Sequence, residues 1–399
     1  MDLRPITEDE LPAFVRVDFT GFGLDPTEDN DEGETLELDR ALGAFDGDEL
    51  VGTTAAYSFE LTLPGLTYVP AAGVTWVAVL PTHRRRGVLR AMMARQLDDI
   101  PEPVAVLGAS EAPIYGRFGY GLASVGHMVH VDPRRSEFRE PVADDGRVVL
   151  LDPETAAKAL PDVFDRSRKV TPGDHQRSQA WWDHWFKDKE HWREGATSRF
   201  YVVHETSAGE ADGFAAYRIK AGWDDHGVPS GELRVESLVT VTAAARAALW
   251  RYLLDVDLIA TVKAQWVAPD DPLRLLLVDP RAARVTGVVD DLWVRLLDVP
   301  TALSARRYDA DGRLVLEVVD SLRPQTGGRF VLDGGECTRT DAAPDLSLDV
   351  ADLGSLYLGG VGAGVLHRAG RIEEHRPGAV ALADQMFRSD PLPFNQTEF

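Results

Sequence analysis

An apolar strand, a basic turn and a helical pattern follow one another directly in the stretch VAVLPTHRRRGVLRAMM, residues 77–93. The run GVTWVAV is typical of a buried strand, and GVLRAMMARQLDDI has the spacing of an amphipathic helix. The first turn of a helix presents unpaired N–H groups and a partial positive charge, and glycine lets an anion approach closely. Neighbouring arginines add charge and hydrogen bonds. This order of elements favours a pyrophosphate-binding turn within a mixed α/β domain. The alternative is a solvated surface turn, because basic residues before a helix also occur on plain surfaces.

The basic turn contrasts with the charge of the whole chain. The sequence holds 65 acidic and 42 basic residues, which gives a net charge of −23. Such a charge repels nucleic acids and anionic membranes and attracts cations. We therefore expect no nucleic-acid partner and no membrane partner, and a cationic substrate is electrostatically favoured. The alternative is that the acidic surface only keeps the protein soluble.

Length and composition set further expectations. A chain of 399 residues is too long for one ordinary core, which predicts two or three domains. No apolar run reaches the roughly 18–20 residues of a membrane helix, and the segment MDLRPITEDE lacks the apolar core of a signal peptide. The single cysteine, Cys337, argues against a disulfide or a cysteine-based metal site. We expect a cytoplasmic protein without a metal.

Three consecutive parts can be distinguished along the chain. The first ~130 residues alternate helical and strand-like segments, including two strands joined at the turn DGDE and a short helix in EAPIYGRFGYG. In the second part, the aromatic cluster of SQAWWDHWF favours packing between helices or domains over a ligand cage. The stretch RVESLVTVTAAARAALWRYLLDV repeats the strand-turn-helix order. Aligning Val77 with Leu238 sets Arg84 against Ala245 and Gly87 against Ala248, so the glycine and most of the positive charge are missing from this copy.

The third part contains predicted strands and a predicted short helix. RLVLEVVD and GGRFVLDGG are expected to form a hairpin, and DLSLDVADLGSLYLGG a strand followed by a helix that ends near Gly359. The tail DPLPFNQTEF has two prolines, which exclude a regular helix or a central strand. It is either an extended docked segment or a disordered end.

The basic turn resembles the acetyl-CoA signature of the GCN5-related N-acetyltransferase (GNAT) superfamily, Arg/Gln-x-x-Gly-x-Gly/Ala. Arg84 and Gly87 match it, whereas Leu89 departs from the usual small residue. The superfamily also often carries Tyr-x-x-x-Gly-Phe/Tyr after the next strand, and Tyr115, Gly119 and Tyr120 fit that pattern. The runs VAVLPTHRRRGVLRAM and ASEAPIYGRFGYG are similar to the enhanced intracellular survival (Eis) family of acetyltransferases, and the similarity extends over the whole chain.

The resemblance implies an α/β (α+β) architecture of three domains. Residues 1–133 would form a catalytic GNAT domain, residues 134–295 a degenerate GNAT-like domain without the cofactor loop, and residues 296–399 a sterol-carrier-protein-like domain. It also implies a homo-oligomer, namely a hexamer.

The resemblance further implies an acetyl-CoA-dependent N-acetyltransferase in which an amine attacks the thioester directly. Tyr115 would be the general acid for the departing thiolate, and the α-carboxylate of Phe399 the general base. A backbone N–H of the strand would stabilise the oxyanion. The residues expected to bind acetyl-CoA are Val77, Ala78, Val79, Arg84, Arg85, Arg86, Gly87, Val88, Leu89, Arg90, Ser110 and Glu111.

For the amine, the family likeness implies aminoglycosides, with protein lysines as a second possibility. Candidate acidic contacts are Asp25, Glu28, Asp29 and Glu398, and candidate apolar walls are Phe22, Trp76 and Phe394. His83 and Tyr120 receive no role. Two alternatives stay open: an acetyltransferase for another native amine, and a non-enzymatic carrier of lipid or hydrophobic ligands built on the third domain.

Overall fold

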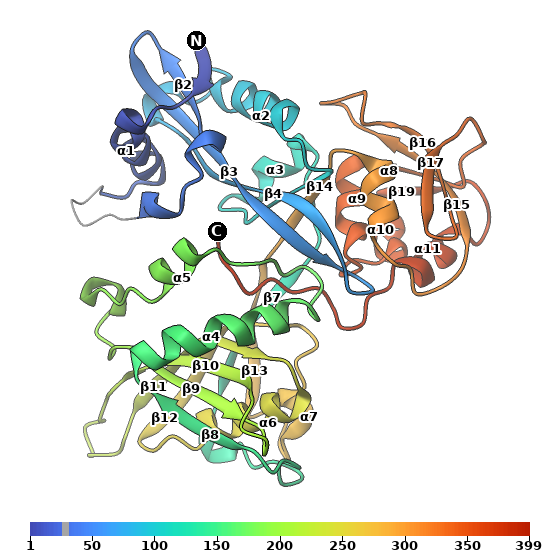
Figure 1. The fold of residues 1–399 in the computed structure, drawn as a ribbon. Helices are drawn as coiled ribbons and strands as arrows, with labels where there is room; N and C mark the ends of the chain where they lie inside the picture. Colours follow the sequence, from blue (N-terminus) through green and yellow to red (C-terminus); the bar gives the residue numbers. More distant parts are fainter. Residues whose placement is uncertain (26–31) are drawn as a thin grey trace. The chain divides into compact units, whose positions relative to one another are not determined.

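The computed structural model describes residues 1–25 and 32–399, and these divide into two compact units. Unit 1 comprises residues 1–124, 290–393 and 397–399, and unit 2 comprises residues 125–289 and 394–396. In Figure 1 the helices and strands of unit 1 run from blue to cyan and from orange to red, and those of unit 2 are mostly green and yellow. The chain therefore leaves unit 1 after its first third and returns to it for the last quarter.

The first sheet of unit 1 has seven strands in the order β1-β2-β3-β4-β5-β14-β6. Their bounds are β1 Asp2–Pro5, β2 Leu42–Asp46, β3 Glu49–Leu63, β4 Thr67–Val79, β5 Val104–Leu107, β14 Trp293–Leu296 and β6 Gly121–Leu122. The predicted turn at residues 46–49 is confirmed, because β2 and β3 pair as an antiparallel hairpin with Asp46 opposite Glu49.

Two helices cover opposite faces of this sheet because its side chains alternate between them. Phe14 of α1 (Leu11–Phe22) packs with Phe45 and Ala55, whereas Met92 of α2 (Val88–Asp99) packs with Ala44 and Val51. A short helix, α3 (Ala112–Tyr115), follows β5 as predicted. Figure 1 shows α1 and α2 on either side of the β2–β4 strands.

Unit 1 also contains a five-stranded sheet of order β17-β16-β15-β18-β19. Its strands are β15 Arg313–Val319, β16 Gly328–Asp333, β17 Glu336–Arg339, β18 Leu346–Asp349 and β19 Ile372–Glu374. Helices α8 (Val299–Ala305) and α10 (Ala363–Arg368) pack on this sheet, and α11 (Ala379–Phe387) packs on α10. Helix α9 (Val350–Tyr357) contacts both this sheet and strands β14 and β6 of the first sheet. The predicted hairpin is confirmed as β15 and β16, and the predicted strand and helix as β18 and α9.

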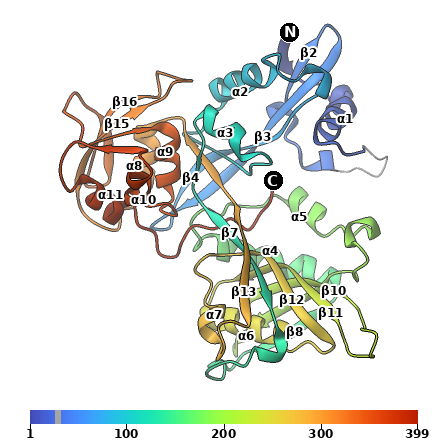
Figure 2. The same cartoon turned by 180° about the vertical axis from the view of Figure 1, so that it is seen from behind.

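Unit 2 holds the second seven-stranded sheet, in the order β13-β7-β12-β11-β10-β9-β8. Its strands are β7 Val125–Val131, β8 Arg147–Leu151, β9 Phe200–Glu205, β10 Ala211–Lys220, β11 Gly231–Thr240, β12 Ile259–Val267 and β13 Ala283–Asp290. Helices α4 (Pro153–Arg168) and α6 (Ala243–Leu254) bury Phe164 and Trp250 in separate clusters. Helices α5 (Gln179–Trp185) and α7 (Leu273–Leu276) complete this unit. Figure 2 shows β7 beside β13 and β12.

The aromatic cluster of unit 2 packs internally, as predicted. The rings of Trp182 and Trp185 are 5.6 Å apart and edge-to-face, and Trp185 and Phe186 are 4.9 Å apart in the same arrangement. The tail from Ser389 onward has no helix or strand, and its docked form is the one observed. The indole N–H of Trp266 donates to the Asn395 carbonyl oxygen at 2.9 Å, and the Gln396 amide donates to Asp174 at the same distance.

The first sheet includes one strand from a distant part of the sequence, whereas the second sheet begins directly after the first. Strand β14 follows the second sheet in the chain but pairs with β5 and β6 of the first, with Arg295 opposite Ala105. Strand β7 directly follows the first sheet in sequence but pairs with β12 of the second, with Val262 opposite Val131. The boundaries expected after residues 133 and 295 stay a prediction.

The alignment proposed for the internal repeat is wrong in its turn. In the first copy, eight residues separate β4 from α2, whereas in the second Val241 and Thr242 alone separate β11 from α6. Thr242 is therefore the counterpart of Gly87, and Ala245 lies inside α6. The basic turn is absent from the second copy because the connection is short, and not because each arginine was replaced in place.

Candidate active site

Strands β4 and β5 separate where they reach the basic turn. They pair in parallel from Ala71 to Gly73 on β4, but β4 continues to Val79 without β5 beside it. The last residues of β4, Val77 to Val79, line a cavity of about 850 Å³ in unit 1. Extended backbone at such an opening can hydrogen-bond an amide-containing chain as an added strand would.

A β-bulge in the pairing of β3 with β4 sets the direction of the β4 backbone that lines the cavity. The pairing of β3 with β4 shifts register between Thr53 and Ala55, and Trp76 opposite the shift has a φ of 55°. A positive φ is strained for a bulky residue, and such strain concentrates at functional sites. The Trp76 ring packs against Phe14 with 5.9 Å between centroids, and its N–H donates to the Tyr57 hydroxyl at 3.1 Å. These contacts hold the bulge in place.

The basic turn ends in a helix whose N-terminus has no side-chain cap. Gly87 is the N-cap of α2, with a φ of 83°, and no side chain accepts from the first N–H groups of the helix. Arg85 also has a left-handed backbone, with a φ of 61°. The N–H groups of Val88 to Arg90 therefore have no acceptor within the helix, which is the arrangement that binds phosphate groups.

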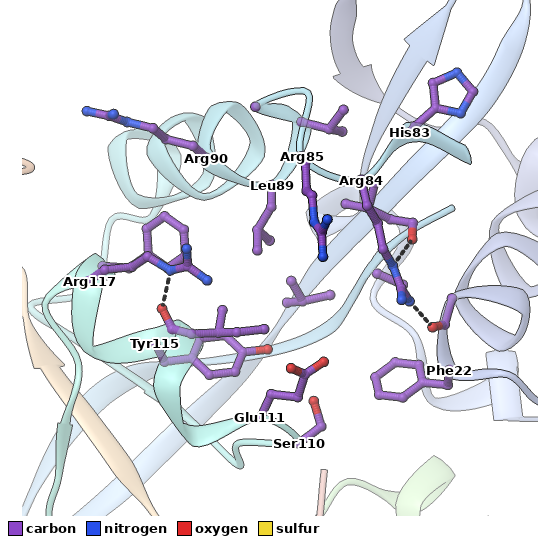
Figure 3. A pocket seen from close by; sticks show the side chains of 18 of the residues that line it. Phe22, His83, Arg84, Arg85, Leu89, Arg90, Ser110, Glu111, Tyr115 and Arg117 are labelled. Atoms are coloured by element: carbon purple, nitrogen blue, oxygen red, sulfur yellow. Dashed lines mark hydrogen bonds between the residues drawn. The ribbon is translucent and has the colours of Figure 1, made fainter. Parts of the chain in front are cut away.

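The predicted arginines divide between the cavity and the outer surface. Arg84, Arg85 and Arg90 line the cavity, together with Arg117, which was not among the residues predicted to bind the co-substrate. Arg86 is not among the lining residues; its guanidinium lies 3.2 Å from Asp46 and lowers the pKa of that carboxyl group. Arg84 donates to the Gly21 carbonyl oxygen at 2.5 Å, which fixes the turn against α1. Figure 3 shows Arg85 and Leu89 pointing into the same space as Tyr115.

Tyr115 lies at the end of α3, and its side chain lines the cavity. Burial raises the pKa of Tyr115 to about 12, and the charges of Glu111 and Asp18 act in the same direction, whereas hydrogen bonding with Ser110 opposes them. Asp18 is a buried carboxyl group on α1, and no motif in the sequence pointed to it. Tyr120 is fully buried, with its ring 6.2 Å from that of Tyr115, so its place is in the core behind the site.

Most of the residues expected to bind acetyl-CoA meet around this one cavity. From that set, the lining includes Val77, Ala78, Val79, Arg84, Arg85, Gly87, Val88, Leu89, Arg90, Ser110 and Glu111. Phe22 and His83 also line it, and His83 lies 3.4 Å from Asp46. Ser321 and Leu322 are further lining residues, and no motif in the sequence pointed to them.

The residues expected at the amine are more scattered. Asp25 and Glu398 are exposed and lie outside the cavity lining, and Glu28 and Asp29 fall outside the described residues. Phe394 belongs to unit 2, where its N–H donates to the Pro172 carbonyl oxygen at 2.8 Å. Phe399 belongs to unit 1 and packs edge-to-face on Phe59, with 4.9 Å between centroids. One of its carboxyl oxygens lies 3.8 Å from the position that a Cβ on Gly108 would take, next to the end of β5.

The second sheet keeps the strand separation but not the phosphate site. Strands β11 and β12 pair in parallel only as far as Val235, although β11 continues to Thr240. At the following helix, the Thr242 hydroxyl accepts from the Ala245 N–H at 3.1 Å and donates to Asp212 at 2.6 Å. The N-terminus of α6 is thus capped by its own chain, which removes an N–H group that a phosphate would need.

Comparisons with known proteins agree with this geometry. Residues 2–123 and residues 173–296 each match a model of the acetyltransferase (GNAT) domain, and residues 299–396 match the sterol carrier protein domain. N-acetyltransferase Eis of Mycobacterium tuberculosis is 37% identical to this chain, and the match covers 96% of each of the two chains. An uncharacterized N-acetyltransferase of Streptomyces avermitilis is 40% identical over 99% of this chain and 97% of its own.

The structural comparison covers the complete chain. The crystal structure of Eis1 from Mycobacterium abscessus matches with a TM-score of 0.90 and 37% identity over all of both chains. In the described part of the chain, no helix has the length and apolar character needed to cross a membrane. Because the GNAT fold uses an acyl-CoA co-substrate, the uncapped helix and the arginines of the cavity have a ligand of matching charge. With relatives this similar over nearly its full length, the chain belongs to the Eis family of GCN5-related N-acetyltransferases.

Proposed function

We propose that this enzyme transfers the acetyl group of acetyl-CoA to a primary amine of a cationic small molecule of the aminoglycoside kind. The observation that carries the proposal is one cavity of unit 1, which joins the uncapped helix α2, the end of β4 that β5 does not pair with, and the Tyr115 side chain. The net charge of −23 favours a cationic acceptor, and the family relationship favours an amine. Protein lysines are the alternative acceptors.

Each part of the co-substrate has matching groups in this proposal. The N–H groups of Val88 to Arg90, with Arg85, bind the pyrophosphate. The backbone of Val77 to Val79 binds the pantetheine arm, and one of its N–H groups stabilises the oxyanion. The amine nitrogen then forms a bond to the carbonyl carbon as the C–S bond breaks, and the thiolate takes the proton of the Tyr115 hydroxyl. The acylated nitrogen releases its second proton to solvent as the amide forms, and the Tyr115 hydroxyl regains its proton from solvent.

The proton of the substrate ammonium group needs an acceptor, and we assign it to the α-carboxylate of Phe399. The ring contact with Phe59 and the position of the carboxyl group beside Gly108 support this role, since β5 ends there and Ser110 of the cavity follows two residues later. A carboxylate with an ordinary pKa of about 3.3–3.7 is a weak base, so a relaying water or a raised pKa is part of the proposal.

The acceptor class is tested by following thiol release from acetyl-CoA with purified protein and a panel of aminoglycosides, polyamines and lysine peptides. We expect turnover with polycationic small molecules and little with lysine peptides. The reverse order would favour the alternative of protein lysines. No turnover with any amine, together with tight lipid binding, would overturn the proposed function.

The role of Tyr115 is tested by substitution. Tyr115→Phe removes the proton but keeps the ring, so we expect kcat to fall about 10²- to 10³-fold while the affinity for acetyl-CoA stays within about twofold. Steady-state rate measurements give kcat, and binding titrations give the affinity for acetyl-CoA. An unchanged kcat would reject the acid role.

The role of Phe399 is tested by separating its ring from its carboxylate. Extending the chain by one glycine keeps the ring but turns the carboxyl group into a peptide carbonyl, whereas Phe399→Ala keeps the carboxylate and loses the contact with Phe59. We expect the extension to lower kcat about 10²-fold and Phe399→Ala to lower it less. An extension without effect would reject the base role.

Two further assignments rest on the family resemblance. We propose a homo-hexamer, and light scattering of the protein as it elutes from a gel-filtration column would measure its mass. We also propose a cytoplasmic location, and fractionation of the producing cells would test it. A monomer or a membrane-associated protein would contradict them.

A further inference from the structure

A segment of the sterol-carrier-like domain reaches the cavity of the GNAT domain. Ser321 and Leu322 follow strand β15 and line the same cavity as Arg85 and Tyr115, all within unit 1. Leu322 also packs against the buried cluster that contains Tyr115 and Phe118. The walls of the site therefore come from two domains of the chain.

One buried arginine fixes this segment. Arg295 lies on the inserted strand β14 and is fully buried, and its Nη2 donates to Oδ2 of Asp320 at 2.6 Å. The other carboxylate oxygen, Oδ1, accepts from the backbone N–H groups of Leu322 at 3.0 Å and Arg323 at 2.8 Å. The carboxylate of Asp320 thus sets the path of the backbone that carries Leu322.

The same arginine fixes the wall around Tyr115. Its Nη1 donates to the carbonyl oxygen of Phe118, at the end of the α3 turn. The following residue, Gly119, has a φ of 81°, and a Cβ there would lie 1.5 Å from this nitrogen. The glycine of the Tyr-x-x-x-Gly motif therefore leaves room for the guanidinium. Arg295 and its two partners couple the position of Leu322 to that of Phe118.

A second link joins the segment to α2. Nε of Arg323 donates to Oδ1 of Asp98 at 3.0 Å, and Asp98 lies in the last turn of the helix that begins at the basic turn. The segment 320–323 is thus held between α2 and the α3 turn, which are the two elements that carry the phosphate and acid groups of the proposed site.

The remaining lining groups suit one end of coenzyme A. The strand edge and the basic turn account for the acyl end and the pyrophosphate in the proposed function. Arg90 and Arg117 lie on the side of the cavity opposite to Phe22 and Arg84 (Figure 3), and they supply positive charge there. Phe118 and Leu322 supply apolar surface. The positively charged surface matches the 3′-phosphate of coenzyme A, and the apolar surface matches the adenine base next to it.

We propose that Ser321 and Leu322 contact the adenosine 3′-phosphate end of coenzyme A, with Arg295 and Asp320 as the positioning residues. The inference rests on the proposed use of acetyl-CoA. It makes the third domain part of the co-substrate site, so that binding of coenzyme A depends on the segment that follows β15.

Binding measurements test the contact without relying on turnover. Coenzyme A and adenosine 3′,5′-bisphosphate are titrated calorimetrically into the full chain, into Leu322→Ala and into a matched control, Val365→Ala, whose side chain is 53% exposed on α10. We expect Leu322→Ala to weaken both ligands about tenfold, as the loss of one apolar contact surface would, and the control to change neither.

The outcomes separate this inference from the proposed function. Unchanged affinity of Leu322→Ala for coenzyme A, or weakening of coenzyme A without weakening of the bisphosphate, would overturn the adenosine contact while leaving the proposed function intact. A native protein that binds no coenzyme A would overturn the proposed function and the inference together. Thermal unfolding of each variant shows whether it is folded.

The positioning role has its own readout. Asp320→Asn weakens the hold on the segment, so we expect the KM for acetyl-CoA to rise about tenfold while kcat and the KM for the amine stay within about twofold. Asp320→Glu keeps the charge opposite Arg295 and should recover part of the loss. A lower melting temperature without this split between the two KM values would show a structural role alone and overturn the positioning claim.

Discussion

The phenol of Tyr115 keeps its proton over the whole neutral range, because burial raises its pKa to about 12. The acid form is complete well below that value and is lost only as the pH rises through it. We therefore expect the kcat of the native enzyme, measured with saturating amine, to show no descending limb from this group between about pH 7 and pH 10. A descending limb in that range that disappears in Tyr115→Phe would contradict the assignment.

Asp174 is a fully buried carboxyl group in unit 2, and burial raises its pKa to about 6 against hydrogen bonding from Gln396 and the charge of Arg177. The unfolded chain has an Asp pKa of about 3.9, so the folded state binds this proton more tightly. The resulting stability is complete below about pH 4 and is lost as the pH rises through 6. Asp174→Asn cannot ionise and should therefore gain on the native protein between about pH 4 and pH 7.

Urea unfolding of unit 2, followed by tryptophan fluorescence at several pH values, measures this difference in the free energy of unfolding. Leu150→Ala is a suitable control, because its side chain is 59% exposed and carries no charge. A difference between Asp174→Asn and the native protein that does not vary with pH would contradict the expectation.

At the scale of elements, the two crossover helices differ in what closes their first turn. The N-terminus of α2 has Gly87 and no capping side chain, whereas Thr242 caps α6. Gly87→Asp places a carboxylate where the phosphate would bind, and aspartate tolerates a left-handed backbone and favours a helix N-terminus. We expect a melting temperature within a few degrees of the native value and an affinity for coenzyme A lower by more than about tenfold.

The matched control for this substitution is Gly335→Asp in the β16–β17 turn. Gly335 has a φ of 84°, close to the 83° of Gly87, and a Cβ at either position meets nothing within 4 Å. The control carries the same backbone cost and the same added charge away from the cavity. Equal affinities of the two variants for coenzyme A would reject the phosphate site at α2.

Local patterns in the sequence predicted those elements whose signals are contained within a few residues. The hairpins at residues 46–49 and 314–332, the short helix before Gly119 and the basic turn before α2 are all of this kind. The prediction of three domains over the whole chain depended on the resemblance to the Eis family, and not on local patterns. The repeat alignment failed at the turn because matching apolar residues does not reveal a shortened connection between β11 and α6.

Contacts between distant parts of the sequence were beyond such patterns. Strand β14 reads as an ordinary apolar run, and its insertion beside β5 depends on backbone pairing across nearly 190 residues of chain. The ion pair of Arg295 with Asp320 and the two lining residues Ser321 and Leu322 follow from that insertion. The one local signal was Arg295 itself, because an arginine inside an otherwise apolar strand is almost never fully buried without a partner.

At the scale of the whole molecule, a net charge of −23 surrounds a cavity lined by four arginines. If the acidic surface attracts a polycationic acceptor, added salt must weaken that attraction, since the Debye length falls from about 30 Å at 0.01 M to about 8 Å at 0.15 M. We expect the KM for an amine with four or more positive charges to rise about tenfold over this range of salt. The KM for a monoamine should change less than about twofold, because its attraction to the same field is several times smaller. Initial rates for both amines at fixed saturating acetyl-CoA measure the effect, and the monoamine serves as the control for any change in the enzyme itself. Equal salt dependence for the two amines would mean that the acidic surface only keeps the protein soluble, and that selection of a cationic acceptor depends on side chains close to the reacting nitrogen.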